Sequence, residues 1–305
     1  MPYFITKAEK LFLEAGPFFH LATKPLEDAL LINDESDYIV INNIIAIVAF
    51  MFDCKILAFA IMSNHLHFIL EGSREECLAF FQEIKARLMR YYRRHGRGDI
   101  IKKIETDPIP ILNLKQLRDE IVYVVRNPFV IRTDVNPLAY RWCSGRLYFN
   151  PFLDTTGKSA AKLSVREKRH LCSSKTDLKL DERLLVQDGV ANPASFVDYK
   201  RAMDFFDNAR QFMMWMFKNV EGQVEASRRH GERPNLNDDE MISITFKLCR
   251  GEYAANSPRE MAMEDKKQLA LKLKNEYSAS NGQIARCVNL PLHIVNSMFP
   301  LSAKN

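Results

Sequence analysis

The sequence predicts an α+β domain with a mainly antiparallel sheet, followed by an all-helical C-terminal domain. Two observations carry this prediction. In the first half of the chain, apolar patterns follow one another in the order strand, helix, two strands, helix, helix. Beyond residue 153 the composition becomes polar and basic, and after that segment only helical patterns follow.

The elements of the first half are read from apolar runs and their boundary residues. Strands are expected at 18–22, 55–62 and 65–70. A helix capped by Asp34 or Ser36 should continue to residue 52, and Ser73 with Glu76 forms a capping box that opens a second helix, up to residue 94. A third helix is expected after a proline-containing segment, over residues 114–126, with Asn127-Pro128 as its end.

The expected domains are 1–153, a linker or insertion at 154–195, and a helical domain at 196–305. Within the last, apolar periodicity predicts helices at 196–220, 238–250 and 257–277, and a final pair near the C-terminus.

The bulk composition indicates a globular protein with an apolar core. Hydrophobic residues make up 47% of the chain, and the net charge of +5 is a mild bias toward anionic partners. The six cysteines form no Cys-x-x-Cys pair, so free thiols in a reducing compartment are expected. The most apolar stretch, residues 39–51, is interrupted by Asn42 and Asn43 and is too short to span a bilayer, and no signal peptide is apparent. A cytoplasmic location without a membrane partner is therefore expected.

Two histidines, His65 and His67, lie two positions apart in an apolar segment. On a strand, alternate side chains project from one face, so both imidazoles can bind a single divalent ion while Leu66 faces the other way. The alternative is a pair of histidines that only form hydrogen bonds on a half-buried sheet. A motif of this length does not decide between the two.

A tyrosine and an asparagine, Tyr123 and Asn127, lie four positions apart and would share one helix face. A nucleophilic hydroxyl and a metal-binding amide oxygen at this spacing can reach one phosphate. The alternative is a partly buried tyrosine followed by an Asn-Pro turn that ends the helix.

Together, the two segments resemble the single-tyrosine transposases of the His-hydrophobe-His (HUH) class, most closely the REP-associated tyrosine transposases. In that family the motifs commonly read Met-Pro-Asn-His-x-His and Tyr-Ile-x-x-Asn-Pro. Here they read Met62-Ser63-Asn64-His65-Leu66-His67 and Tyr123-Val124-Val125-Arg126-Asn127-Pro128. The segments 16–20 and 140–144 are similar to two further family segments, so the resemblance covers residues 12–153. This chain departs from the pattern at Ser63, at Cys143 and after His20, where the family often has an arginine.

The resemblance implies a ferredoxin-like catalytic domain that cleaves and rejoins single-stranded DNA bearing a hairpin or palindromic repeat. It implies Tyr123 as the nucleophile that forms a covalent 5′-phosphotyrosine, and His65, His67 and Asn127 as ligands of a divalent metal, Mg²⁺ or Mn²⁺. Such an ion polarises the scissile phosphate, which a weakly nucleophilic phenol needs in order to attack. A monomer and a homodimer are both compatible with the resemblance.

Residues 85–103 hold eight cations against one acid, with two tyrosines among them. This mixture suits a groove that follows phosphates and stacks bases. The expected DNA-contacting residues are Lys85, Arg87, Arg90, Tyr91, Arg93, Arg94, Arg97, Lys102 and Lys103. The alternative is a solvated basic helix face.

Residues 280–299 resemble a helix-turn-helix, with helices at 283–288 and 292–299. His293, Asn296 and Ser297 would lie on the exposed face of the second helix. Because that face carries no Arg or Lys, packing or protein contact is an alternative use of the motif.

Two further functions fit the same segments. A rolling-circle replication initiator or relaxase shares the chemistry, but usually shows a different motif order or several histidines and paired tyrosines. A domesticated DNA-binding regulator would have lost catalysis, and the intact Tyr123 and histidine pair argue against it.

Overall fold

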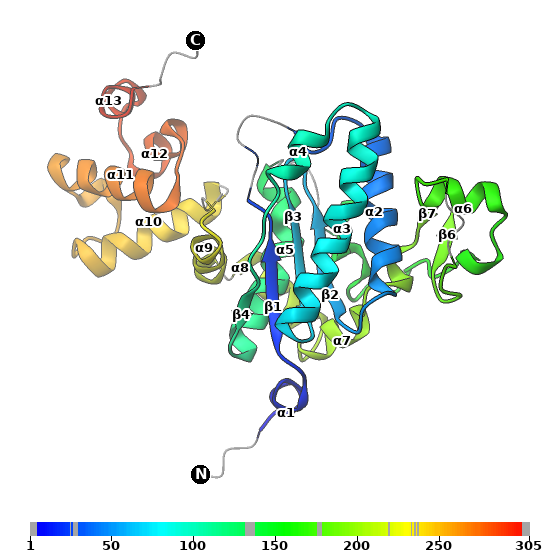
Figure 1. Cartoon of the computed structure of the whole chain (residues 1–305). Coiled ribbons are helices and arrows are strands. Elements are labelled where there is room, and N and C mark those ends of the chain that lie inside the picture. Colours follow the sequence, from blue (N-terminus) through cyan, green and yellow to red (C-terminus); the bar gives the residue numbers. More distant parts are fainter. Residues whose placement is uncertain are drawn as a thin grey trace. The chain divides into compact units, whose positions relative to one another are not determined.

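The structure is a computed structural model that describes the chain except for residues 1–4, 25, 27–29, 132–137, 176–178, 219, 233, 235, 237 and 301–305. The chain divides into two compact units, Met1–Asn219 and Val220–Asn305 (Figure 1). Among the described residues, none of the helices combines the length and the apolarity that crossing a bilayer requires.

A four-stranded antiparallel sheet forms the centre of the first unit, with the strands in the order β2-β3-β1-β4. The strands are β1 (Phe18–Ala22), β2 (Lys55–Ile61), β3 (Leu66–Glu71) and β4 (Ile109–Ile111). Helix α2 (Glu35–Ala49) connects β1 to β2, and α3 (Arg74–Arg94) connects β3 toward β4. The prediction of a mixed domain built on an antiparallel sheet is confirmed.

The first turns of α2 and α3 form where the sequence predicts them. Asp34 caps α2, because its side chain accepts a hydrogen bond from the backbone N–H of Asp37. Ser73 and Glu76 form the expected capping box at the start of α3, in which each side chain accepts from the other residue's backbone N–H.

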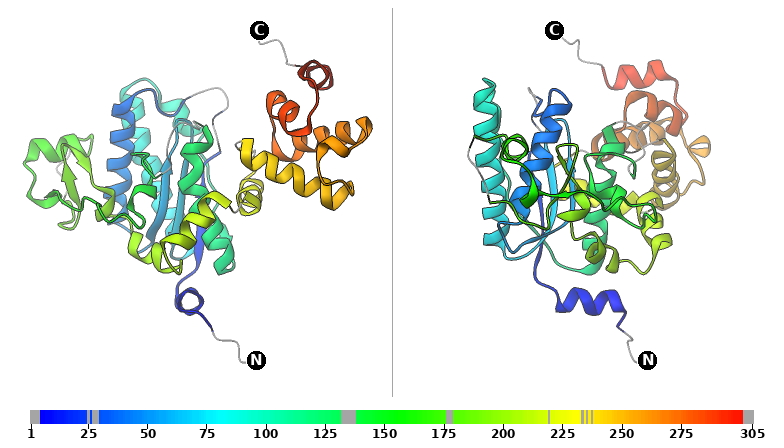
Figure 2. Two further views of the ribbon diagram at one scale, coloured as in Figure 1. Left: turned by 180° about the vertical axis from the view of Figure 1, so that it is seen from behind. Right: turned by 90° about the vertical axis from the view of Figure 1, so that its right-hand side faces the viewer.

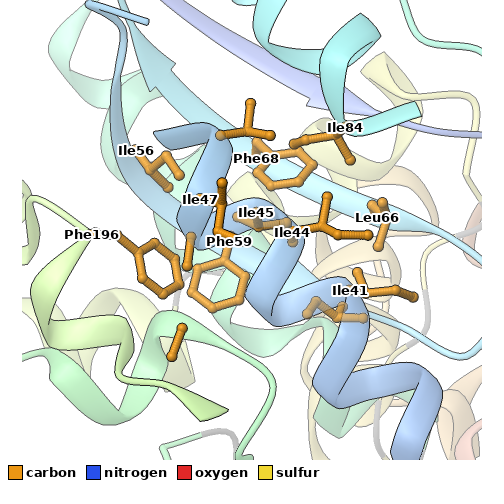
Figure 3. Packing of buried hydrophobic residues seen from close by; sticks show 14 of the residues in the cluster. Ile41, Ile44, Ile45, Ile47, Ile56, Phe59, Leu66, Phe68, Ile84 and Phe196 are labelled. Atoms are coloured by element: carbon orange, nitrogen blue, oxygen red, sulfur yellow. The ribbon is translucent and has the colours of Figure 1, made fainter. Parts of the chain in front are cut away.

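The two faces of the sheet are covered by different helices. Helices α2 and α3 pack on one face around a cluster that includes Ile45, Phe59 and Phe68 (Figure 3). Helix α5 (Leu114–Ile131) packs on the other face around Ile121 and Val124. The left view of Figure 2 shows the molecule from behind, with this helix in front of the sheet. Side chains that alternate along β1 and β3 therefore point either to α2 and α3 or to α5.

Within the described residues before α5, three short elements were not predicted, namely α1 (Lys7–Glu14), α4 (Gly98–Lys102) and β4. Strand β4 contains Pro110, which pairs with Phe19. Strand β4 lies at the edge of the sheet, where no further strand pairs with its outer side in the sheet order. A proline, which has no backbone N–H to donate, is therefore tolerated on that side.

Helix α5 does not end at Asn127-Pro128 as expected, but continues to Ile131. Proline cannot donate the helical hydrogen bond to the carbonyl four residues earlier, that of Val124. The thiol of Cys143 lies 4.0 Å from this oxygen and 3.9 Å from that of Val125, and donates to the two carbonyls instead. A residue distant in sequence therefore lets the helix continue past its proline.

Residues 154–195, expected to be a linker or insertion, form a small three-stranded sheet with one helix. The elements are β5 (Lys158–Ser159), η2 (Ala160–Lys162), α6 (Val165–Leu171), β6 (Leu185–Gln187), β7 (Val190–Ala191) and η3 (Pro193–Ser195). Asp188 and Gly189, both with positive φ, form the turn of the β6–β7 hairpin. Asp-Gly between two short apolar-containing strands is a strong hairpin signal that the polar composition concealed.

The hairpin docks on α2 through two asparagines in the most apolar stretch of the sequence. Asn43 accepts from the N–H of Ala191 at 2.8 Å and donates to the carbonyl of Gly189 at 2.9 Å. Asn42 donates to the carbonyl of Ala191 at 2.9 Å. The two amides therefore satisfy the backbone of β7, an edge strand of the small sheet.

The first compact unit runs to Asn219, beyond the boundary expected near residue 153. Helices α7 (Tyr199–Asp204) and α8 (Ala209–Lys218) stand where one continuous helix was expected. The chain turns between them and buries Phe205, Phe206 and Phe212 in the cluster around α5, which attaches both helices to this unit. The 3₁₀ helix η1 (Ser144–Leu147) lies beside the same cluster, which includes the preceding Cys143 and the following Tyr148.

The described elements of the second unit are all helical. They are α9 (Val220–Arg229), α10 (Asp238–Glu252), η4 (Pro258–Glu260), α11 (Met263–Tyr277), α12 (Asn281–Val288) and α13 (Leu292–Met298). The single helix expected at 257–277 begins instead as the 3₁₀ turn η4, and α11 starts at Met263. Helices α12 and α13 occupy the expected pair of positions, and Asn289 in the left-handed conformation ends α12.

Candidate active site

Two histidines from neighbouring strands meet on the face of the sheet that α5 covers. In the antiparallel pairing of β1 and β3, His20 lies opposite Ile69 and His67 lies opposite Ala22. His20 and His67 are therefore diagonal neighbours on one face, and their ring centroids are 5.3 Å apart. Both side chains are fully buried.

A continuous series of hydrogen bonds, here called the histidine chain, links β1 and β3 to α5. Glu120 Oε2 lies 2.7 Å from His20 Nδ1, and His20 Nε2 lies 3.1 Å from His67 Nδ1. His67 Nε2 in turn lies 3.1 Å from the side-chain amide of Asn127. Glu120 and Asn127 are seven positions apart on α5, two helical turns, which places them on the same helix face as Tyr123.

The donor and acceptor capacities of these side chains constrain the protons along the histidine chain. A carboxylate oxygen only accepts, so His20 Nδ1 donates to Glu120. When His20 is neutral, its Nε2 accepts from His67 Nδ1–H, and the lone pair of His67 lies on Nε2, toward Asn127. When His20 is protonated, its Nε2–H donates to His67 Nδ1, and the proton of neutral His67 lies on Nε2 instead. The histidine chain thus couples the charge of His20 to the tautomer of His67.

His65 precedes β3, and its ring lies 4.6 Å from that of His67, centroid to centroid. Its Nδ1 is 2.7 Å from Asn64 Oδ1, so Nδ1 donates and the lone pair is on Nε2. Burial, and secondarily the charge of His20, lower the pKa of His65 to about 4. His65 is therefore neutral at physiological pH, the state in which an imidazole can bind a metal.

Tyr123 lies beside these imidazoles. Its ring centroid is 5.7 Å from that of His67 and 6.0 Å from that of His20, and 6% of the residue is exposed. The fold thus brings together all four residues expected at the chemical site, His65, His67, Tyr123 and Asn127.

The donor set fits a divalent cation. Two ligands at right angles on one octahedral ion, each about 2.1 Å away, lie about 3 Å from each other. The side-chain amide of Asn127 and His67 Nε2 are 3.1 Å apart, and an amide can turn its oxygen to the same position. Imidazole nitrogen and amide oxygen together suit Mn²⁺ or Mg²⁺.

His20 and Glu120 were not among the expected site residues. His20 is a lone polar residue in an otherwise apolar strand, and Glu120 precedes Tyr123 by three positions on one helix face. These were the available signals. The partnership itself spans 100 residues and is created by strand pairing and by the packing of α5.

The basic residues of segment 85–103 lie apart from this site. They belong to α3 and the chain that follows it, and α3 covers the sheet face opposite α5. Several have partners within the fold: Arg97 pairs with Asp37 at 2.7 Å, and Tyr91 donates to the same carboxylate. Further pairs join Arg87 and Arg90 to Glu83 and Lys102 to Asp99. A cavity of about 380 Å³ beside α3 is lined by Arg87, Arg90, Tyr91 and Arg94, together with residues 172–174.

The expected contact residues of the helix-turn-helix lie on α13. His293, Asn296 and Ser297 are exposed, but Asn296 accepts from Asn281 of α12 at 3.0 Å, and Ser297 donates to the carbonyl of Ile294. Asn296 thus joins α13 to α12, whereas the bond of Ser297 lies within α13.

No model of a known protein family matches the chain, and no curated protein matches it at a significant level. Among solved structures, a REP-associated tyrosine transposase bound to a REP hairpin is similar to this chain. The match covers 44% of this chain and 78% of the other, with 19% sequence identity and a TM-score of 0.35. A likeness at this level does not establish a family.

Proposed function

We propose that this protein is a metal-dependent transposase or endonuclease that cleaves and rejoins single-stranded DNA through a covalent phosphotyrosine. The observation that carries the proposal is the placement of Tyr123 against His67, whose Nε2 faces the side-chain amide of Asn127, one turn after Tyr123 on the same helix. A nucleophilic hydroxyl and a set of metal-binding atoms thus converge on a point where a phosphate can bind. The split β-α-β-β-α-β order of the sheet, a ferredoxin-like arrangement, agrees with this assignment.

His65, His67 and Asn127 would hold the divalent ion. When bound, the ion supplies positive charge that polarises the scissile phosphate and offsets the charge of the transition state. Glu120 and His20 do not reach the ion in this proposal. They are positioning residues, because they fix the ring of His67 and, with His20 neutral, leave its lone pair on Nε2.

Tyr123 would attack phosphorus and form a bond to the 5′ phosphate, while the bond to the neighbouring 3′ oxygen breaks. The phenol loses its proton, and the departing 3′ oxygen gains one through solvent. Because the phosphotyrosine keeps the phosphodiester energy, a 3′-OH can reverse the step on the same or another strand. Strand transfer therefore requires no nucleotide cofactor.

The cations of segment 85–103 without a carboxylate partner among the described residues, Lys85, Arg93, Arg94 and Lys103, are proposed to bind DNA outside the site, and Arg94 also lines the cavity beside α3. Arg97 is given a structural role rather than a DNA contact, because it pairs with Asp37 and donates to the carbonyls of Leu30 and Leu31. A hairpin or palindromic repeat is the proposed substrate, with monomer and homodimer both open.

The test is formation of a covalent adduct on a denaturing gel. Full-length protein with Mn²⁺ and a labelled hairpin oligonucleotide should give a protein–DNA band that chelator abolishes. Tyr123→Phe should fold and bind DNA but form no band, and Asn127→Ala should require more Mn²⁺. Tyr253→Phe is the matched control, because Tyr253 is a partly buried tyrosine that packs against the core of the second unit. An adduct with Tyr123→Phe would refute the assignment, and binding without any adduct in the wild type would favour a DNA-binding regulator.

A further inference from the structure

A second cavity, which none of the expected site residues lines, lies in the first unit where the β6–β7 hairpin docks on α2. It has a volume of about 160 Å³. Its polar lining comes from three places: Asn42 of α2, Arg141 and Arg146 around the start of η1, and Gln187, Asp188 and Asn192 of the hairpin and the residue that follows it. This is smaller than the pockets of about 300–1,000 Å³ that enclose drug-sized ligands. It has room for one planar ring or one phosphate, with the rest of a ligand outside.

Asn42 joins two walls of the cavity, α2 and the hairpin. The residue is 1% exposed, and its amide nitrogen donates to the carbonyl of Ala191 in the hairpin. Its Oδ1 accepts no hydrogen bond from any residue that the structure describes, but this oxygen is buried and is not presented to a ligand. Asn42 therefore shapes the cavity, and the binding groups come from the other two walls.

Arg146 supplies an unused cation. Its side chain forms no hydrogen bond or ion pair with the described residues, although it is partly buried. Burial, and then the positive charge of Arg141, lower the pKa of Arg146, so the fold holds this cation in an unfavourable place. Two carboxylates are also near: the charge of Asp154 acts on the pKa of Arg146 in the opposite direction, and Asp188 belongs to the lining, but both residues are exposed to solvent. Two neighbouring guanidinium groups favour an anion that accepts from both.

Arg141 is held in a fixed orientation beside it. Its guanidinium lies 4.7 Å from the centre of the ring of Trp142, which also stacks on Tyr38 at 5.3 Å with an interplanar angle of 10°. The ion pair of Arg141 with Glu35, at 2.7 Å, is between exposed side chains and is therefore weak. A phosphate can replace Glu35 while the stacked guanidinium stays in place.

We propose that this cavity binds the phosphate of one nucleotide in a nucleic-acid strand, with Arg141 and Arg146 as its partners and the base outside the cavity. Because every nucleotide of a strand carries the same phosphate, the cavity fixes the position of a nucleotide without requiring one sequence. The choice of a strand over a free nucleotide rests on the proposed function. The anion site itself rests on the cavity alone.

Binding of a fluorescein-labelled, mixed-sequence 12-nucleotide single strand to full-length protein tests the inference. All variants carry Tyr123→Phe and metal is omitted, so that binding is measured whether or not the protein cleaves DNA. Arg146→Gln should weaken binding about tenfold, the effect of removing one charge-assisted hydrogen bond. The slope of log affinity against log salt should fall by about 0.7, the value for one phosphate of a single strand that is no longer neutralised.

Arg183→Gln is the matched control. Arg183 lies beside the same small sheet but is exposed, pairs with Asp181 and does not line the cavity. It should leave both the affinity and the slope unchanged. Arg146→Lys should restore the slope but only part of the affinity, because it keeps the charge and loses the planar fork.

Wild-type binding by Arg146→Gln, or equal losses of affinity in the two Gln variants, would overturn the inference. Free dAMP should displace the strand weakly, and only from protein that retains Arg146. Tighter binding of free dAMP than of the strand would overturn the assignment to a nucleic-acid strand. Adduct formation by Tyr123 is scored in the separate gel assay, so either hypothesis can fail alone.

Discussion

Replacing Glu120 by Gln removes a charge from the inner end of the histidine chain while keeping the size of the side chain. The distance of 2.7 Å between Glu120 Oε2 and His20 Nδ1 is typical of a charge-assisted hydrogen bond. Gln can still accept from His20, but it can also turn its amide N–H toward the ring. We therefore expect the orientation of His67 to be less strongly fixed and the metal to bind more weakly.

The magnitude follows from the hydrogen-bond energies. A bond to a charged group contributes about 1.5–3 kcal/mol and a neutral one about 0.5–1.5 kcal/mol, so the substitution should cost about 1–1.5 kcal/mol. This corresponds to about a tenfold rise in the dissociation constant for Mn²⁺. The value lies at the lower end of the roughly 10–100-fold losses seen when the partners of metal-binding residues are changed.

Isothermal titration calorimetry of full-length protein with Mn²⁺ measures this change, and a thermal melt without metal verifies the fold. The matched control is Asp119→Asn, the adjacent buried carboxylate on α5, which contacts Lys115 and Trp215 rather than the histidines. A positioning role further requires that adduct formation by Glu120→Gln recover at higher Mn²⁺. Equal Mn²⁺ affinities of Glu120→Gln and Asp119→Asn, or no recovery, would refute the reasoning.

Four further outcomes follow from the structure. Burial raises the pKa of Cys143 to about 12, so native Cys143 should resist alkylation by iodoacetamide at pH 8 and react in denaturant, as mass spectrometry would show. Since the folded pKa is raised, the stability gained from the neutral thiol is complete below about pH 9. It should be lost as the pH rises toward 12, a loss that denaturation of Cys143→Ala would not show. Phe59→Ala should lower the free energy of unfolding by about 3–5 kcal/mol, because Phe59 is fully buried in the core between the sheet and α2. Arg97→Ala should cost about 2–3 kcal/mol in urea unfolding because it leaves buried Asp37 without its cation, whereas exposed Arg93→Ala should be neutral.

Local sequence patterns were sufficient for the elements that hold the site. Strands β1 and β2 and the starts of α2 and α3 follow from apolar runs and from capping residues such as Asp34 and Ser73. These signals depend on residues within one or two turns of each other, so they can be recognised in the sequence without knowledge of the fold. The His65–His67 spacing and the Tyr123–Asn127 spacing belong to the same class.

The partners that organise the site are not local. His20 and Glu120 lie 100 positions apart, and no periodicity relates them. Their contact depends on β1 pairing with β3 and on α5 crossing the same sheet face. In the same way α5 continues past Pro128 because Cys143, distant in sequence, supplies a donor to Val124.

The two polar residues in the apolar helix α2 have a role that the sequence alone does not reveal. Asn42 and Asn43 interrupt the stretch 39–51, and alone they indicate only that it is not a membrane span. The structure assigns them to the backbone of the β6–β7 hairpin, whose strands of two and three residues are too short to show a period. The docking of the hairpin and the cavity beside it both depend on these two amides.

Counting cations in a sequence overstates a basic surface, because it cannot subtract the cations that have internal partners. Of the eight in residues 85–103, four pair with carboxylates in the fold: Arg87, Arg90, Arg97 and Lys102. The other four, Lys85, Arg93, Arg94 and Lys103, have no carboxylate partner within the described residues, although Arg94 donates to a backbone carbonyl. Each phosphate of a single strand that is neutralised adds about 0.7 to the slope of log affinity against log salt. The four cations without carboxylate partners therefore contribute a slope of about 3, whereas all eight would contribute about 6. Because α3 and Tyr123 also lie on opposite faces of the sheet, this charge can recruit DNA but cannot position the scissile phosphate. Positioning must come from groups on the α5 face, which is where the histidine chain lies.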